Sequence, residues 1–481
     1  MRSILVTGLL IWVLQPAAAQ EMLGSSFSNY AGQMGVGFNP ASIVGAPYRW
    51  ELNLLSGDFA AQNNYMYLQA NSNAIRKSMQ GEAIPEDEFT DNFTTSDKWM
   101  YSSSFLKYPS FTWSGEKFAF AASVSTRAEV SATEIPYHLA KFMKEGFDYD
   151  PLQQTDWQAT SGNAAMLNWH EFSVTGGMVL WDDGVNYWTG ALTLNYNYGL
   201  NGLYLDINDF QYNSLADTLL VVYNLNADYG YALPEDQDNT NDFLKRKGAG
   251  FSGSFGLRYM HNRNENYFDP CKRKNDEKPY DFRIGFSLID LGSISFNNQA
   301  ATFSIVDEST LWYGIDTVKF SSIRNLDSTL GLQFAGNPEA FRAGNSMSVF
   351  TPTALTMDVD VPLNSWFFVN AAIVQRIPVG KYQVARMNQL SFTPRIEFRR
   401  FEFALPLSVY EYSKARLGAA FRIGAFTFGT DILSPLIGLT DAYGADFYFG
   451  ISLKGLGECG RAKGGSGRKV RLEKCNTPGR N

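Results

Sequence analysis

The sequence GADFYFGISLK, residues 444–454, decides the fold class. Its apolar and polar side chains alternate, and because a β-strand has a side-chain period of two, one face is apolar and the other polar. The apolar face consists of Phe447, Phe449, Ile451 and Leu453, and the polar face of Asp446, Tyr448, Gly450, Ser452 and Lys454. Similar segments recur from residue 48 onward, which indicates an all-β chain.

An export signal is expected ahead of these strands. Arg2 supplies a positive charge, residues 4–14 form an apolar run too short to cross a bilayer, and Ala17-Ala18-Ala19 fits a cleavage site. Residues 1–19 are therefore interpreted as a signal peptide. A signal followed by alternating strands predicts a transmembrane antiparallel β-barrel in the outer membrane of a Gram-negative bacterium.

Composition agrees with a barrel and narrows the classes of partner. Aromatic residues make up 15% of the 481 residues and charged residues only 18%, a balance that aromatic girdles and lipid-facing strands produce. A secreted array of β-sandwiches has a similar composition and is the alternative. The net charge of −8 argues against a nucleic-acid partner.

Alternation and turn residues predict about fourteen strands. Their expected ranges are 48–68, 98–113, 117–131, 167–181, 187–207, 250–262, 280–292, 350–361, 366–376, 386–399, 401–412, 414–424, 425–434 and 443–454. The barrel proper is thus expected over residues 48–454. With the last strand running towards the periplasm, the connections 69–97, 132–166, 208–249 and 293–348 fall outside, where outer-membrane barrels carry their long loops. Only the connection 263–279 breaks this segregation.

Two segments flank the predicted barrel. Residues 20–47 lack alternation but are too apolar for a free tail, so they are interpreted as a plug in the lumen, with Met34, Val36, Phe38, Asn39 and Pro40 as its central residues. Residues 455–481 are rich in Gly, Lys and Arg and predict a flexible basic periplasmic tail. Cys459 and Cys475 within it are candidates for a disulfide in an oxidising periplasm, while Cys271 stands alone.

Two short helices are expected in the outer loops. Residues 136–145 start at a proline and stop at Gly146, and their apolar stripe is Leu139, Phe142 and Met143. Residues 73–80, followed by Gly81, are the second candidate. Such helices could cap the barrel and hold its loops down, or they could form an apolar vestibule for a ligand.

The phase of the strands places charged side chains of both signs in the lumen. Such a set can pair across strands and hold a plug, because an unpaired charge in a narrow lumen is costly. It argues against an open ion pore of a single sign. The set comprises Arg127, Glu129, Arg258, Arg283, Asp358, Asp360, Arg395, Glu397, Arg399, Glu402, Arg416, Arg422, Asp431 and Asp446.

The sequence carries little that indicates catalysis. His170-Glu171 begins like a metalloprotease motif but has no second histidine at helical spacing, and it lies in a predicted strand. The acidic run 236–242 lacks the glycine and the final carboxylate of a calcium loop. No enzyme activity, cofactor or metal is therefore expected.

Four stretches carry a resemblance to known families: Asn39-Pro40-Ala41-Ser42 with Tyr48-Arg49-Trp50-Glu51, LIDLGSI at 288–294, Pro352-Thr353-Ala354-Leu355, and GADFYFG at 444–450. With its strand number, N-terminal segment and helical outer loops, the chain resembles the FadL-type outer-membrane transporter superfamily. It is nearest to an uncharacterised Bacteroidota outer-membrane β-barrel family. The resemblance implies a lumen plug and a lateral opening in the wall, although the charged lumen departs from the greasy conduit of fatty-acid transporters.

Two functions remain open at this point. The first is a passive, porin-like channel for hydrophobic or amphipathic small molecules, with outer-membrane lipid and an apolar ligand as partners. The second is a non-transporting assembly barrel, because the same superfamily includes partners of the type IX secretion machinery. The basic tail would then contact a periplasmic or secretion-complex protein; peptidoglycan, anionic lipid or no partner at all are its other options.

Overall fold

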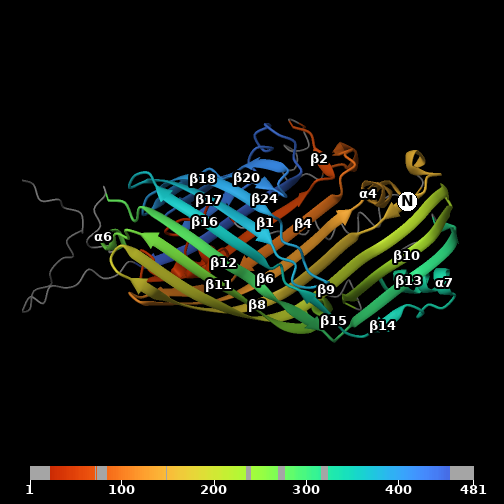
Figure 1. Ribbon diagram of the computed structural model, residues 1–481, viewed down its shortest axis with the longest axis horizontal. Helices are drawn as coiled ribbons and strands as arrows, with labels where there is room; N and C mark the ends of the chain where they lie inside the picture. Colours follow the sequence, from red (N-terminus) through yellow and green to blue (C-terminus); the bar gives the residue numbers. More distant parts are fainter. Residues whose placement is uncertain are drawn as a thin grey trace, which may run out of the picture.

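The first and last strands close the ring. β1 (Trp50–Asn63) pairs antiparallel with β24 (Gly444–Gly455), and Phe59 lies opposite Phe447 in their register. The computed structural model describes residues 22–70, 72, 84–147, 149–234, 240–268, 277–315 and 323–455. Within these ranges the main sheet is a closed antiparallel barrel of 14 strands (Figure 1), which confirms the expected fold class and strand number.

Some barrel strands are continuous and others are interrupted. Besides β1 and β24, the continuous strands are β6 (Phe118–Ile135), β8 (Gly162–Asp182), β9 (Asn186–Ala216), β11 (Gly248–His261), β12 (Phe282–Phe296), β17 (Phe367–Arg376), β18 (Gln389–Glu397) and β23 (Phe426–Thr430). The interrupted strands are β4 (Lys98–Lys107) with β5 (Ser110–Ser114), β15 (Met347–Phe350) with β16 (Ala354–Pro362), β19 (Phe401–Ala404) with β20 (Leu407–Tyr410), and β21 (Lys414–Leu417) with β22 (Ala419–Ile423). The interruptions contain Pro109, Pro352, Pro406 and Gly418. A proline has no backbone N–H to donate to the neighbouring strand, and a glycine has no side chain to pack on the sheet.

The two faces of the strands differ as the alternation predicts. On β24, Phe447 is 51% exposed while its neighbour Tyr448 is fully buried. Exposed Phe and Leu residues recur around the ring at Phe255, Phe286, Phe392 and Leu453. This apolar outer belt is the surface that faces lipid in an outer-membrane barrel.

Phe286 tests the assignment of the lipid face, because it lies in the middle of β12, opposite Leu257 of β11 and Met357 of β16. Phe286→Arg is expected to lower the free energy of unfolding by about 2–4 kcal/mol in lipid vesicles, since it places a charge at the bilayer midplane. Ser309→Arg, at an exposed position on β13 (Ala300–Tyr313) beyond the barrel, is the matched control and should change little. Equal stabilities for both variants would reverse the assignment of the faces.

One side of the barrel rises far beyond the rest. β9 is 31 residues long, and its upper half pairs with β10 (Leu219–Ala232), which in turn pairs with β13 (Figure 1). These strands lie in the connections 208–249 and 293–348, which the sequence predicted as loops, so that prediction was wrong. The prediction failed because a sheet above the membrane needs no lipid-facing side. Polar residues such as Asn208, Asp209 and Gln211 therefore interrupt the alternation of apolar residues by which membrane strands are recognised.

Short elements cover the end of the barrel from which β9 rises. Helix α4 (Tyr137–Glu145) forms where the sequence predicts it, between Pro136 and Gly146. The helix expected at 73–80 lies outside the described residues. The remaining short elements are β2 (Met66–Leu68), η2 (Glu86–Glu88), β3 (Phe89–Asp91), η3 (Asp150–Leu152), β7 (Trp157–Ala159), α5 (Thr240–Phe243), α7 (Ile323–Ala335) and β14 (Arg342–Gly344), while α6 (Glu265–Phe268) lies at the opposite end. No helix within the described ranges is long and apolar enough to cross a membrane.

Helix α4 is fixed to the barrel mouth by charge as well as by its apolar side. Leu139 and Phe142 are buried, but Met143 is 54% exposed, so the predicted stripe holds only for the first two. Lys141 and Lys144 both donate to Asp91 of β3. Burial of Asp91 would raise the pKa of its carboxyl, but these two hydrogen bonds outweigh it and lower the pKa on balance.

Candidate functional site: the lumen

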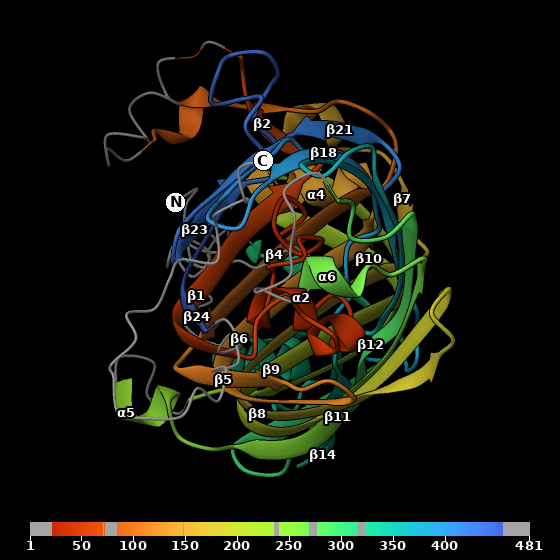
Figure 2. The same cartoon turned by 90° about the vertical axis from the view of Figure 1, so that its left-hand side faces the viewer.

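Residues 22–47 lie inside the ring of strands (Figure 2). They fold into α2 (Gln33–Val36) and the 3-10 turn η1 (Pro40–Ile43). Asn39 caps η1 by accepting a hydrogen bond from the backbone N–H of Ala41, and its amide donates to the carbonyl of Leu257 on β11 at 3.0 Å. The structure places all five predicted plug residues in buried positions, namely Met34, Val36, Phe38, Asn39 and Pro40.

Polar contacts fasten this segment on facing sides of the ring. On one side, the backbone N–H of Gln33 donates to Glu51 Oε2 of β1 at 2.9 Å, and the Gln33 amide donates to Thr112 Oγ1 of β5 at 2.6 Å. About half a ring away, Arg283 of β12 donates to the carbonyl of Phe27 at 2.7 Å. A segment without regular structure thereby has its backbone groups satisfied inside a protein.

One charge cluster of the lumen lies beside Asn29 of the plug. Arg395 forms a two-pronged ion pair with Asp360, and its Nε donates to Glu397 Oε2 at 3.1 Å. The amide of Asn29 donates to Glu397 Oε1 at 2.9 Å. Arg283 completes the cluster, because its guanidinium lies 3.7 Å from Asp358 and 3.8 Å from Asp360.

A second cluster lies on the other side of the lumen. Arg127 pairs with Glu129 at 3.0 Å, with Glu171 at 3.3 Å and with Asp290 at 3.0 Å. Arg386 also pairs with Asp290, which therefore joins two guanidinium groups. Three carboxylates and two cations leave this cluster close to neutral, as expected for a scaffold of paired charges.

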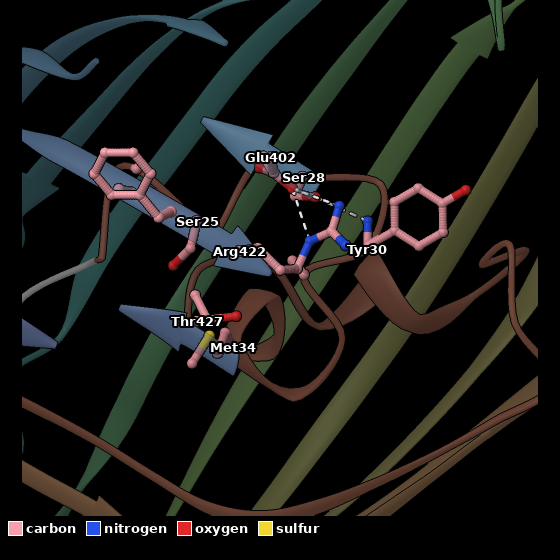
Figure 3. A pocket seen from close by; sticks show the side chains of 11 residues that line it. Ser25, Ser28, Tyr30, Met34, Glu402, Arg422 and Thr427 are labelled. Atoms are coloured by element: carbon pink, nitrogen blue, oxygen red, sulfur yellow. Dashed lines mark hydrogen bonds and ion pairs between the residues drawn. The ribbon is translucent and has the colours of Figure 1, made fainter. Parts of the chain in front are cut away.

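A third contact holds the start of the plug against the wall. Arg422 of β22 pairs with Glu402 of β19 at 3.0 Å, and Ser28 of the plug donates to the same carboxylate at 2.6 Å (Figure 3). The guanidinium of Arg422 also lies 4.8 Å from the ring centre of Tyr30. Further along, Asp431 accepts a hydrogen bond from the backbone N–H of Leu23 at 2.9 Å.

The remaining predicted lumen charges divide into two groups. Arg258, Arg416 and Asp446 are buried on the inner face, and Arg258 reaches the plug by donating to the carbonyl of Ser42 at 3.4 Å. Arg399 is exposed in the turn between β18 and β19, so its predicted lumen position was wrong. The strand ends at Glu397, and the period of two no longer applies beyond it.

Above the plug the lumen contains a cavity of about 140 Å³. Its floor comes from the plug and is mainly apolar, with Met22, Met34 and Phe38 beside Ser26 and Gln33, and the paired charges of the Arg127 cluster border it. Its walls carry many small polar side chains, namely Ser102, Ser103, Ser123, Ser173, Thr193, Asn195 and Ser254. The cavity therefore offers an apolar surface on one side and hydrogen-bonding groups on the other.

Residues 377–388, which join β17 to β18, cross above this cavity and are called the strap here. The backbone N–H of Ala385 donates to Ser131 Oγ of β6 at 2.9 Å, and Arg386 reaches Asp290 of β12. Tyr382 stacks on Tyr204 of β9 with ring centres 3.7 Å apart. The cavity is thus bordered by the plug below and by the strap above.

The barrel wall is incomplete between β21 and β24. β23 pairs with β24 only from Phe426 to Gly429, and within the described ranges no strand pairing joins 414–417 to 444–447. Residues 431–443 cover this break, and Leu433 N–H donates to the carbonyl of Leu417 at 2.7 Å. The outer surface of the covering segment is apolar, with Leu436, Ile437 and Leu439 exposed.

Several residues of the site were missed by the sequence analysis, among them Asn29, Gln33 and Arg386. Asp290 shows why, because it has a positive φ of 54° within an irregular stretch of β12, where the register to β11 shifts. Both Ile289 and Asp290 are buried there, so a strict alternation assigns Asp290 to the wrong face. The sequence does carry one signal for Asp290, because a carboxylate inside the apolar segment 288–294 is unusual for a lipid-facing position.

The three cysteines Cys271, Cys459 and Cys475 lie outside the described residues, as does the basic tail. Among the histidines, His170 shares a hydrogen bond of 2.8 Å with Thr126 on the neighbouring strand β6.

The fold and its filled lumen define a class: the protein is a transmembrane β-barrel whose N-terminal segment occupies the lumen. The chain belongs to a family of unknown function, DUF5723, whose model matches residues 40–431. That range begins inside the plug at Pro40 and ends at Asp431, the first residue of the segment that covers the wall break. No curated protein matches the chain.

Solved structures with some likeness are other outer-membrane barrels. The translocator domain of the autotransporter NalP from Neisseria meningitidis has 9% identity and a TM-score of 0.31, over 84% of this chain and 88% of that one. A mutant of the TodX monoaromatic hydrocarbon channel has 9% identity and a TM-score of 0.31, over 88% and 94%. A Pseudomonas aeruginosa FadL homologue has 8% identity and a TM-score of 0.24, over 91% and 98%. These values carry no argument about function.

Proposed function

We propose that this barrel is a gated passive channel for small hydrophobic or amphipathic molecules. The observation that carries the proposal is the cavity between the plug and the strap. Its volume of about 140 Å³ is close to that of a cavity that holds benzene, roughly 150 Å³, so a small organic molecule fits. An apolar floor facing hydroxyl-bearing walls suits a molecule with one apolar and one polar side.

The charges of the lumen support a closed resting state. In the described part of the lumen, Arg127 and Arg395 pair with carboxylates, and Glu397 also holds the plug, so the wall carries both signs of charge rather than a ring of one sign. Passage then requires the plug or the strap to move. The break between β21 and β24 offers a second route, since displacement of residues 431–443 would open the lumen sideways, as the FadL resemblance implies.

Filling the cavity tests the proposal. Ser123→Trp places an indole among the cavity walls and is expected to reduce binding of a fluorescent aliphatic probe at least tenfold, because the free space is occupied. Binding is measured with the purified full chain in nanodiscs. The matched control is Ser309→Trp, exposed on β13 and outside the barrel, which should bind the probe as the native chain does. Equal binding by both variants would remove the cavity as the ligand site.

An assembly barrel without transport is the second candidate, and the double closure of the lumen favours it. Such a barrel needs the plug and the strap as permanent structure, and its partners would bind through the loops or the basic tail. Flux measurements separate the two candidates. A folded native chain that increases the uptake of no apolar compound into liposomes would leave the assembly function.

A further inference from the structure

The sheet that rises above the barrel carries an apolar face that nothing in the described chain covers. Leu219 and Val221 of β10 lie opposite Tyr313 and Leu311 of β13 in the register, so all four share one face. Tyr313 is 70% exposed, Leu311 53% and Tyr223 49%. The group called the tip face comprises Leu215, Leu219, Val221, Tyr223, Leu311 and Tyr313.

The opposite face of the same sheet is a packed core. Tyr212, Leu220 and Trp312 are buried there against Phe142 of α4 and Leu330 of α7. His138 of α4 strengthens this packing, since its Nδ1 shares a hydrogen bond of 2.7 Å with the hydroxyl of Tyr212. The tip face therefore belongs to a folded, two-sided layer whose inner side is already satisfied.

The surroundings of the tip face are acidic. Residues 149–160, 203–232 and 300–315 contain eight carboxylates and no Lys or Arg. Lys381 of the strap pairs with two of them, Asp206 and Asp228, at the base of the sheet. Within the described part of the chain, no cation pairs with the other six, namely Asp150, Asp156, Asp209, Asp217, Asp307 and Glu308.

Two of these carboxylates border the tip face directly. Asp156 accepts hydrogen bonds from the amide of Asn213 at 2.8 Å and from the hydroxyl of Tyr223 at 3.0 Å. Asp217, in the turn between β9 and β10, accepts from the amide of Gln153 at 3.0 Å. Neutral donors hold both groups in place and leave their negative charge available to a partner.

Lipid does not explain the apolar character of the tip face. The last strongly exposed leucine of the belt on β9 is Leu194, and Leu215 follows 21 residues later on the same strand. At about 3.3 Å per residue and a tilt of about 45°, the tip face lies on the order of 50 Å further from the bilayer centre, whereas the apolar band is about 25 Å tall. The carboxylates Asp156 and Asp217 at the edge of the tip face are called the acidic rim here. Their negative charge would repel anionic lipid headgroups.

We propose that the tip face is a docking surface outside the cell for another protein, which presents an apolar segment flanked by Lys and Arg. An exposed apolar patch rimmed by polar groups is typical of an interaction site, and the acidic rim selects a partner of opposite charge. This docking function is separate from the proposed channel, and it requires neither the plug nor the cavity.

Site-specific photo-crosslinking in intact cells tests the docking surface. A photoreactive residue replaces Leu311 or Tyr313 in the full chain, and the control site is Glu339, which is exposed after α7 and outside the tip face. We expect a protein adduct from the first two sites and none from the third. Mass spectrometry of the adduct should identify a crosslinked segment rich in apolar and basic residues.

A charge variant makes the test specific. Asp156→Asn combined with Asp217→Asn keeps the shape of the rim and removes two charges, so the adduct should fall at least fivefold, as it should in high salt. A native urea-unfolding midpoint of the same variant in lipid vesicles shows that the barrel is folded. Adducts with lipid, adducts that ignore the charge change, adducts equally strong at Glu339, or no protein adduct at all would overturn the docking surface.

Discussion

Deleting residues 20–46 is expected to raise the conductance of the barrel in planar bilayers and the passage of small solutes into liposomes. The deletion removes the floor of the cavity and the hydrogen bonds that Gln33, Asn29 and Phe27 make to three parts of the ring. The freed carboxylates Glu51, Glu397 and Asp431 would then face water. Water and small solutes should then enter the lumen.

The matched control for the deletion is Gly37→Ala. A Cβ at Gly37 meets no atom within 4 Å, so this variant should keep the plug in place and the conductance low. Adding Arg386→Gln to the deletion loosens the strap, and any further rise in conductance measures the barrier that the strap contributes. A folded deletion variant that conducts no better than the native chain, with or without Arg386→Gln, would show that the segment does not seal the lumen. The assembly function would then stand.

Arg395→Gln is expected to lower the free energy of unfolding by about 3–5 kcal/mol, because it leaves Asp360 and Glu397 buried without their main cation. Arg395 is 2% exposed, and its two carboxylate partners are fully buried. Glu397 also holds Asn29 of the plug, so the loss should loosen the plug and raise conductance in the same variant. Unfolding by urea in lipid vesicles provides the measurement.

Arg399→Gln is the matched control, since the same exchange takes place four residues away. Arg399 is exposed in a turn, and its replacement should change the free energy of unfolding by less than about 0.5 kcal/mol. If Arg395→Gln were as mild as Arg399→Gln, the buried cluster would contribute no more than a surface charge does.

The strands were predictable because lipid imposes a simple rule on them. Every second residue of a membrane strand must be apolar, so Phe286 and Phe392 set the phase from which the inward positions of Arg283 and Arg395 on the same strands follow. The rule applies only while a residue faces lipid. Arg399, in a turn, was therefore misplaced.

Two further parts escaped prediction for related reasons. β10 and β13 lie above the membrane, where residues 219–223 are apolar on both faces and polar residues such as Asn224 and Asp307 occur elsewhere, so no alternation marks these strands. The strap has no pattern at all, and its position depends on a pairing between Arg386 and Asp290, which are 96 residues apart.

The lumen itself was predictable in its composition but not in its contacts. Asn29 and Glu397, whose side chains bond at 2.9 Å, are 368 residues apart in the chain. A single sequence gives no measure of such proximity. The apolar residues Met34, Val36 and Phe38 predicted that the N-terminal segment would be buried, and the mixed charges predicted what would surround it. Only the structure shows which charged side chain of the wall bonds to which atom of the plug.

The seam between β1 and β24 has a consequence for biogenesis. Lys454 of the last strand donates to the carbonyl of Tyr30 at 2.6 Å and lies 3.6 Å from Glu51, so the final strand contacts the N-terminal segment as well as β1. Because Lys454 bonds to both, the pairing of β24 with β1 and the seating of the N-terminal segment stabilise each other. A barrel whose last hairpin has not yet paired lacks one of the contacts that hold the start of the chain, so the two ends of the polypeptide are expected to settle together.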